Sequence, residues 1–167
     1  MAPLKKLRDY LSLIKFSHTV FALPFAFIGL TLGFIELKNN GTEQPFQWMM
    51  LVKMLLCMVF ARSAAMSFNR YLDREFDALN PRTAKREIPA GVIKPGQALL
   101  FTIINCIFFV VTTWFINEAC FYLSFVALFV ILFYSYTKRF TALCHIVLGV
   151  GLSLSPIGAF LSVTGYF

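Results

Sequence analysis

The sequence has few acidic residues, few histidines and no closely paired cysteines. Only 8 of its 167 residues are Asp or Glu, against 15 Lys and Arg, and 2 are histidines. No Ser-His-Asp arrangement, zinc pattern, dinucleotide motif or C-x-x-C pair is present. The cysteines are therefore predicted to be reduced thiols, and His18 and His145 to be structural. These absences leave the common hydrolase, zinc-enzyme and dinucleotide-dependent classes without a candidate site.

Apolar residues dominate the chain instead. They make up 59% of it, 20 residues are Phe, and the mean hydropathy is +0.74. A soluble domain has only about 45–50% apolar residues, so the excess predicts a protein embedded in a lipid bilayer. The net charge of +7 fits the topology-setting role of cations in membrane proteins. No basic stretch is interleaved with aromatics in a soluble context, so no nucleic-acid partner is predicted.

Five apolar segments are close to the roughly 20 residues that a helix needs to cross the hydrocarbon core. The predicted fold class is all-α, a transmembrane helical bundle forming a single membrane domain over residues 1–167. Residues 1–15 are basic and amphipathic and are predicted to lie at the interface, and residues 70–96 to form a cytoplasmic cap loop. The predicted spanning segments are 16–35, 48–68, 98–116, 119–136 and 143–163.

The cations gather on one side of this layout. If all five segments span, twelve of the fifteen fall on the side of the N-terminus and of the loop between the second and third segments. The positive-inside rule then places that side in the cytoplasm. Gly29 and Gly33, four residues apart in the first segment, and the small residues of the fifth segment predict close helix packing. The twelve cations are Lys5, Lys6, Arg8, Lys15, Arg70, Arg74, Arg82, Lys85, Arg86, Lys94, Lys138 and Arg139.

Asn69, Asp73 and Asp77 follow one another at intervals of four, where an apolar segment ends and a basic loop begins. On a helix such residues share a face. Mg²⁺ sites use one or two carboxylates and let substrate phosphates fill the remaining positions. The spacing therefore indicates half of a magnesium–diphosphate site at the membrane surface, with the two acids as metal ligands. The alternative is a solvated helix end whose acids pair with Arg70 and Arg74.

Basic residues near this motif are candidates for binding phosphate. Arg62 lies inside the second apolar segment, where a charged group usually faces a polar cavity; the alternative is snorkelling to the headgroups. Arg82 and Arg86 lie in a loop whose length and charge suit either a phosphate-binding cap or a purely topogenic segment. Lys138 ends the fourth segment, where it either reaches a diphosphate or anchors the helix at the headgroups.

Together these motifs resemble the UbiA family of intramembrane aromatic prenyltransferases, in its 4-hydroxybenzoate polyprenyltransferase-like branch. The resemblance covers essentially the whole chain. One departure is the sequence Arg-Glu-Ile-Pro at residues 86–89, where many members read Arg-Pro-Leu, and it indicates a sub-branch. The segments that resemble family motifs are the opening 15–25, the first aspartate-rich motif 69–77, the basic signature Arg82, Thr83 and Arg86, and the Tyr-x-x-x-Lys motif 134–138.

The resemblance implies a nine-helix bundle with a second aspartate-rich motif in its C-terminal half. No such motif occurs here, and the chain ends at Phe167 without a polar tail. We therefore expect the chain to be the N-terminal half of the enzyme, with the C-terminal half of the bundle missing. Alone it is expected to have little or no activity.

The activity that the resemblance implies is Mg²⁺-dependent transfer of a polyprenyl group from its diphosphate to an aromatic acid, at the cytoplasmic face of a bacterial inner membrane. 4-Hydroxybenzoate, for ubiquinone, is the expected acceptor, and a naphthoate-type acceptor, for menaquinone, is the alternative. An inactive fragment of the same family and a transporter with acids along an ion path are further alternatives. The implied catalytic and metal-binding residues are Asn69, Asp73 and Asp77, and the implied diphosphate-binding residues are Arg62, Arg82, Arg86 and Lys138.

Overall fold

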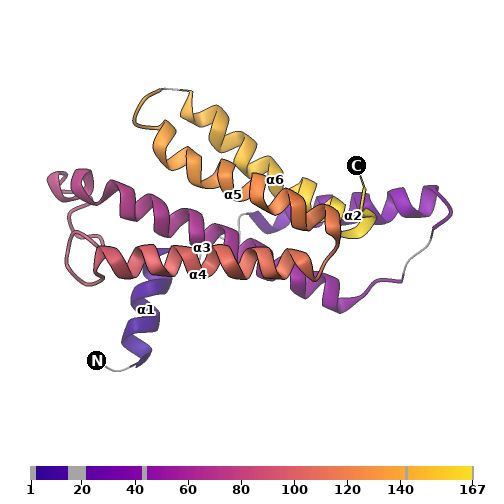
Figure 1. Ribbon diagram of the computed structural model, residues 1–167, viewed down its shortest axis with the longest axis horizontal. Helices are drawn as coiled ribbons and strands as arrows, with labels where there is room; N and C mark the ends of the chain where they lie inside the picture. The colour runs from indigo at the N-terminus through magenta and orange to yellow at the C-terminus, as the bar shows by residue number, and fades with distance from the viewer. Residues whose placement is uncertain (1–2, 15–21, 43–44, 142, 167) are drawn as a thin grey trace.

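The computed structural model describes residues 3–14, 22–42, 45–141 and 143–166, and within these ranges the chain forms helices and no strand (Figure 1). The predicted all-α membrane fold class is confirmed. Lys15, His18 and the first part of the first predicted span lie outside the described residues. The six helices are α1 (Pro3–Leu13), α2 (Leu23–Asn39), α3 (Trp48–Leu79), α4 (Pro95–Trp114), α5 (Glu118–Thr137) and α6 (Cys144–Thr164).

Helices α3 to α6 are long and apolar enough to cross a membrane. They correspond to the second to fifth predicted spans, with bounds within a few residues except at the end of α3. α2 covers most of the first predicted span and has 17 residues. α1 corresponds to the predicted amphipathic segment that precedes the bundle.

The end of α3 differs from the prediction. The apolar run stops near residue 68, but the helix continues to Leu79 and α4 begins at Pro95, so the loop is 80–94 rather than 70–96. The charged residues after the apolar run are mostly good helix formers. The helix stops because Asn80 is extended, with φ −99° and ψ 119°, as favoured for a residue that precedes a proline, here Pro81.

The length of α3 explains how it can carry charges at its end. At 1.5 Å per residue, its 32 residues extend about 48 Å, whereas the hydrocarbon core is about 30 Å thick. When the helix starts at the interface near Trp48, its last turns project beyond the hydrocarbon. These turns hold Asn69, Asp73 and Asp77. The motif is therefore a rigid continuation of a spanning helix.

The helices form two antiparallel pairs with α2 at one end (Figure 1). α3 packs most extensively against α4, and α2 against α6, while α5 contacts α3, α4 and α6. The charged end of α3 and the end of α5 lie at the same end of the bundle, away from α2 (Figure 1). This arrangement brings together residues that are 65 and 69 positions apart in the sequence, namely Lys138 with Asp73 and with Asn69.

Gly29 and Gly33 allow α2 to approach α6 closely, which confirms the packing prediction. A Cβ atom at Gly29 would lie 2.1 Å from the carbonyl oxygen of Pro156, and one at Gly33 would lie 2.9 Å from Cβ of Val163. Both distances are shorter than a van der Waals contact, so the helix pair depends on the absence of these atoms. The buried side chains around this contact are Ala26, Leu30, Leu37, Met54, Ala159 and Val163.

Candidate functional site

The first part of the site joins the end of α3 to the loop that follows it. Arg86 donates from one guanidinium nitrogen, Nη1, to both carboxylate oxygens of Asp77, at 2.6 and 2.8 Å. The Asp77 side chain is only 9% exposed. Thr83 Oγ1 donates to the Asp77 carbonyl at 2.9 Å, and so satisfies an acceptor that the end of the helix leaves open. The loop is therefore folded back over the last turn of α3.

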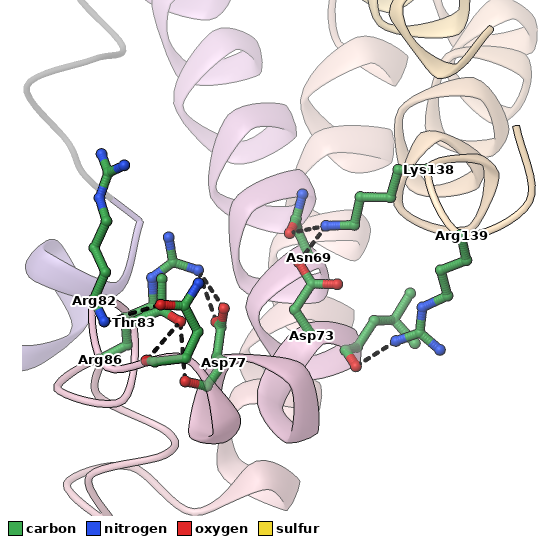
Figure 2. A network of polar contacts seen from close by, with 10 residues as sticks. Asn69, Asp73, Asp77, Arg82, Thr83, Arg86, Lys138 and Arg139 are labelled. Atoms are coloured by element: carbon green, nitrogen blue, oxygen red, sulfur yellow. Dashed lines mark hydrogen bonds and ion pairs between the residues drawn. The ribbon is translucent and has the colours of Figure 1, made fainter. Parts of the chain in front are cut away.

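The second part joins α3 to α5. Lys138, the C-cap residue of α5, donates from Nζ to Asn69 Oδ1 at 2.7 Å and forms an ion pair with Asp73. Asn69 and Asp73 thus share one ammonium group, as their spacing of four on one helix face allows. Figure 2 shows Lys138 reaching across to α3 from the end of α5.

The acids are not a solvated helix end. The Asp73 and Asp77 side chains are 17% and 9% exposed, and each is paired with a cation from another segment. Arg74 pairs with the exposed Glu75 instead. The side chain of Arg82 extends away from Asp77 (Figure 2), and its backbone N–H donates to Asn80 Oδ1. Arg82 is therefore the one predicted loop residue that this arrangement does not bring to the acids.

The donor set fits a magnesium–diphosphate complex better than a metal held by protein alone. Within the described ranges, no group of three or more His, Cys, Asp or Glu side chains is placed to hold a metal ion. Two carboxylates and an amide oxygen on successive turns are nonetheless oxygen ligands of the kind that Mg²⁺ combines with water and phosphate, although Asp77 is turned toward Arg86 and Asp73 toward Lys138 (Figure 2). The cations beside them suit the phosphate charge.

An apolar cavity of about 410 Å³ adjoins the charged cluster, between α3, α4, α5 and α6. Arg62, Asn69 and Tyr134 lie on its wall among mostly apolar side chains. The buried Nε of Arg62 has no hydrogen-bond partner in the part of the chain that the structure describes. Arg62 therefore faces the cavity, as its position in the sequence predicted. Asn69 both lines the cavity and accepts from Lys138, so the apolar and charged parts of the site meet there.

Two further cations, Arg139 and Arg70, belong to this region, although neither was predicted as a site residue. Arg139 donates from Nη2 to the Leu72 carbonyl at 2.5 Å and lies 5.3 Å from the ring centroid of Phe76. It thereby fastens α5 to the turn of α3 that carries Asp73. Arg70 is only 6% exposed. The signal for Arg139 was its place beside Lys138, whereas nothing in the sequence showed that Arg70 is buried.

These features define a helical membrane protein with a charged site at the mouth of an apolar cavity. Residues 23–167 match the UbiA prenyltransferase family. The chain belongs to that family. It is similar to a 4-hydroxybenzoate octaprenyltransferase from Tolumonas auensis, 38% identical over 104 residues, which are 62% of this chain and 36% of the relative. A protoheme IX farnesyltransferase from Bdellovibrio bacteriovorus is 36% identical over 97 residues, 58% of this chain and 31% of the relative.

Solved structures give the same fold. A UbiA homolog from Aeropyrum pernix K1, in its apo form, superimposes with a TM-score of 0.79 at 30% identity, over 89% of this chain and 51% of that one. A UbiA homolog from Archaeoglobus fulgidus, bound to GPP and Mg²⁺, gives a TM-score of 0.75 at 23% identity, over 95% and 55%. The chain thus spans about half the length of these structures and a third of the two curated relatives.

Proposed function

We propose that this chain forms the diphosphate-binding half of a prenyltransferase that moves a polyprenyl group from its diphosphate to an aromatic acceptor. The observation that carries the proposal is the junction at Asn69, where an apolar cavity of about 410 Å³ meets the ion pair of Lys138 with Asp73. A second ion pair, Arg86 with Asp77, lies one helical turn further along α3. A prenyl diphosphate has the same division into a long apolar tail and a compact, highly charged head. The volume lies within the usual range for small-molecule sites, roughly 300–1,000 Å³.

Each part of the cluster has a role in this proposal. Asp73 and Asp77 would hold Mg²⁺ together with the diphosphate, and Asn69 would support them. When bound, the ion neutralises charge on the phosphate oxygens and so favours departure of diphosphate. Without a bound ligand, the charges of the two acids are balanced within the site, because each acid has a cation partner.

The cations bind the leaving diphosphate in this proposal. Arg86 and Lys138 are 35% and 23% exposed, so they are partly removed from water, where electrostatic stabilisation of developing charge is stronger. Arg62 and Arg82 are the weaker candidates, since Arg62 lies on the cavity wall and Arg82 points away from the acids. Aromatic side chains near the cavity would steady the allylic cation by cation–π contact.

The proposed acceptor is 4-hydroxybenzoate, supported by relatives that carry that name in several bacteria. A naphthoate-type acceptor is the alternative, because the Arg-Glu-Ile-Pro sequence at 86–89 indicates a sub-branch that also contains such enzymes. The cations at one end of the bundle support a bacterial inner-membrane protein with the site facing the cytoplasm. An assay of both acceptors with the same prenyl diphosphate, with and without Mg²⁺, distinguishes the two.

The decisive experiment replaces the acids one at a time. Asp73→Asn and Asp77→Asn, made in a polypeptide of the length of the relatives, are each expected to lower Mg²⁺-dependent diphosphate release by about 100-fold or more, as loss of a key charged group in a site does. The matched control is Glu75→Gln, because Glu75 lies between them on α3 with a side chain 79% exposed. Wild-type turnover in both aspartate variants would show that these acids do not bind the metal–diphosphate.

A further inference from the structure

Arg70 carries a buried charge that the proposed function does not use. It is 6% exposed, and its Nη1 has no hydrogen-bond partner among the described residues. The charges that act on its guanidinium are those of Arg86, Glu87, Asp77 and Asp73. The two aspartates already have cation partners. Glu87 makes no ion pair within the described residues, either with Arg70 or with another cation.

Glu87 is held from the other side by α1. Its Oε1 accepts a hydrogen bond of 2.5 Å from Ser12 Oγ, 75 residues earlier in the chain. Its Oε2 is buried without a hydrogen-bond partner in the described ranges. Its carbonyl accepts from the Ile93 N–H at 3.0 Å, which closes the loop on itself. The hydrogen bond from Ser12 to Glu87 therefore joins α1 to the loop 80–94.

Apolar packing supports the same contact. Leu13 of α1 is fully buried, together with Ile88 and Ile93 of the loop and Ala98 at the start of α4. The ring of Tyr10 lies 4.9 Å from that of Phe101, centroid to centroid. Because Ile88 and Glu87 directly follow Arg86, docking of α1 restrains the backbone from which the Arg86 side chain extends.

We propose that Glu87 is a positioning residue which, held by Ser12 of α1, keeps the loop 80–94 where Arg86 contacts Asp77. Arg86 reaches both Asp77 oxygens from one nitrogen, so a shift of the loop would break both contacts together. The consequence for diphosphate binding rests on the proposed function, whereas the placement of the loop does not. The amphipathic helix at the membrane surface is thereby part of the site.

The first test measures the loop without any ligand. In the full chain in detergent micelles, Ser12→Ala is expected to speed trypsin cleavage after the exposed Arg82 by about two- to tenfold, the range expected for one lost hydrogen bond. Glu87→Gln is expected to act in the same direction. Cleavage after Arg82 is scored because a change at Glu87 alters the trypsin site after Arg86 directly.

Matched controls lose comparable groups elsewhere. Ser153→Ala removes an exposed serine that donates only to Val150 of its own helix, and Glu75→Gln removes an acid 79% exposed. Both are expected to leave the cleavage rate unchanged. Equal rates for Ser12→Ala and the wild type would overturn the proposal, whatever Glu87→Gln does to folding.

The second test measures the consequence at the site. Affinity for geranyl methylenediphosphonate with Mg²⁺, a prenyl diphosphate analogue whose P–C–P linkage resists hydrolysis, is measured without an aromatic acceptor and is expected to fall by about two- to tenfold in Ser12→Ala. In an Arg86→Gln background, Ser12→Ala is expected to lower the affinity no further, because the hydrogen bond from Ser12 to Glu87 acts on binding through the position of Arg86. If Ser12→Ala still lowers the affinity in the Arg86→Gln background, its effect does not pass through Arg86, and the proposal that Glu87 positions Arg86 is wrong.

The outcomes separate this inference from the proposed function. If the wild-type chain binds no diphosphate analogue, the proposed function fails, and the trypsin rates still decide whether α1 holds the loop. If the wild type binds and Ser12→Ala speeds cleavage without changing affinity, the loop is braced but Arg86 is not positioned by it, and the inference fails alone. The inference is supported if Ser12→Ala both speeds cleavage and lowers the affinity, and if the fall in affinity disappears in the Arg86→Gln background.

Discussion

Gly29→Ala is the substitution for which the structure predicts the sharpest effect. The added Cβ would lie 2.1 Å from the carbonyl oxygen of Pro156. A carbon and a carbonyl oxygen in close contact are normally about 3.3–3.6 Å apart. The added Cβ and the Pro156 oxygen must therefore move apart by about 1.2–1.5 Å. The oxygen belongs to the backbone of α6 and cannot rotate away. The two helices must therefore separate or slide.

The loss of stability comes from the contacts between α2 and α6 that weaken when the two helices separate. Overpacking a well-packed contact costs about 1–3 kcal/mol and occasionally more, and a gap of about 0.5–1 Å forfeits a quarter to a half of each dispersion contact along it. The gain in helix propensity from Gly to Ala is only about 0.5–1 kcal/mol. We expect Gly29→Ala to lower the free energy of unfolding by about 2–3 kcal/mol, at the upper part of that range.

Two other glycines provide a graded comparison. A Cβ at Gly33 would meet the Val163 side chain at 2.9 Å and the Phe160 carbonyl at 3.1 Å, so Gly33→Ala should cost less, about 1 kcal/mol. At Gly149 no described atom lies within 4 Å of the added Cβ, and Gly149→Ala should be neutral or slightly stabilising.

The assay is reversible unfolding in mixed micelles of increasing SDS content, followed by circular dichroism. From most to least stable, the expected order is Gly149→Ala, Gly33→Ala and Gly29→Ala. If Gly29→Ala unfolds together with Gly149→Ala, the close approach of α2 and α6 is not present in the folded chain, and the account of this helix pair is wrong.

Two further predictions concern the other end of the bundle and the cavity. Asn117 accepts from the Cys120 N–H and donates to the Leu161 carbonyl, both at 2.8 Å. Asn117→Ala should lower unfolding free energy by about 1–3 kcal/mol, and Asn117→Asp, which keeps the cap acceptor and loses the donor, by less; equal losses would contradict the double role. Cys57 and Cys120 line the cavity and Cys106 does not, so geranyl methylenediphosphonate with Mg²⁺ should slow maleimide labelling of Cys57 and Cys120 but not of Cys106, as measured by mass spectrometry.

The helices and the motif were predictable because both depend on local sequence. Hydrophobic length predicted α3 to α6, since a spanning helix needs only enough consecutive apolar residues. The spacing of four in Asn69, Asp73 and Asp77 predicted a shared helix face. The end of α3 was misplaced by about ten residues, because the apolar run and the helix end for different reasons. The run ends at the hydrocarbon boundary, whereas the helix ends before Pro81.

The partners of the site residues were not predictable in the same way. Lys138 lies 65 residues from Asp73 and 69 from Asn69, and Ser12 lies 75 residues from Glu87. Such contacts depend on how α1, α3 and α5 pack, which no local pattern encodes. The same holds for Arg70, which is only 6% exposed, and for Arg82, whose side chain turns away from Asp77 (Figure 2) although its neighbours in the sequence matched the motif.

The sequence by itself therefore determined that the chain is a helical membrane protein with paired acids and many cations at one surface, because length, hydropathy and helical spacing are properties of adjacent residues. Only the tertiary structure decided which cation meets which acid, that Arg62 and Asn69 face a common cavity, and that α1 reaches the loop through Glu87. These contacts depend on how closely the helices pack, which small residues govern pair by pair, as Gly29 does between α2 and α6.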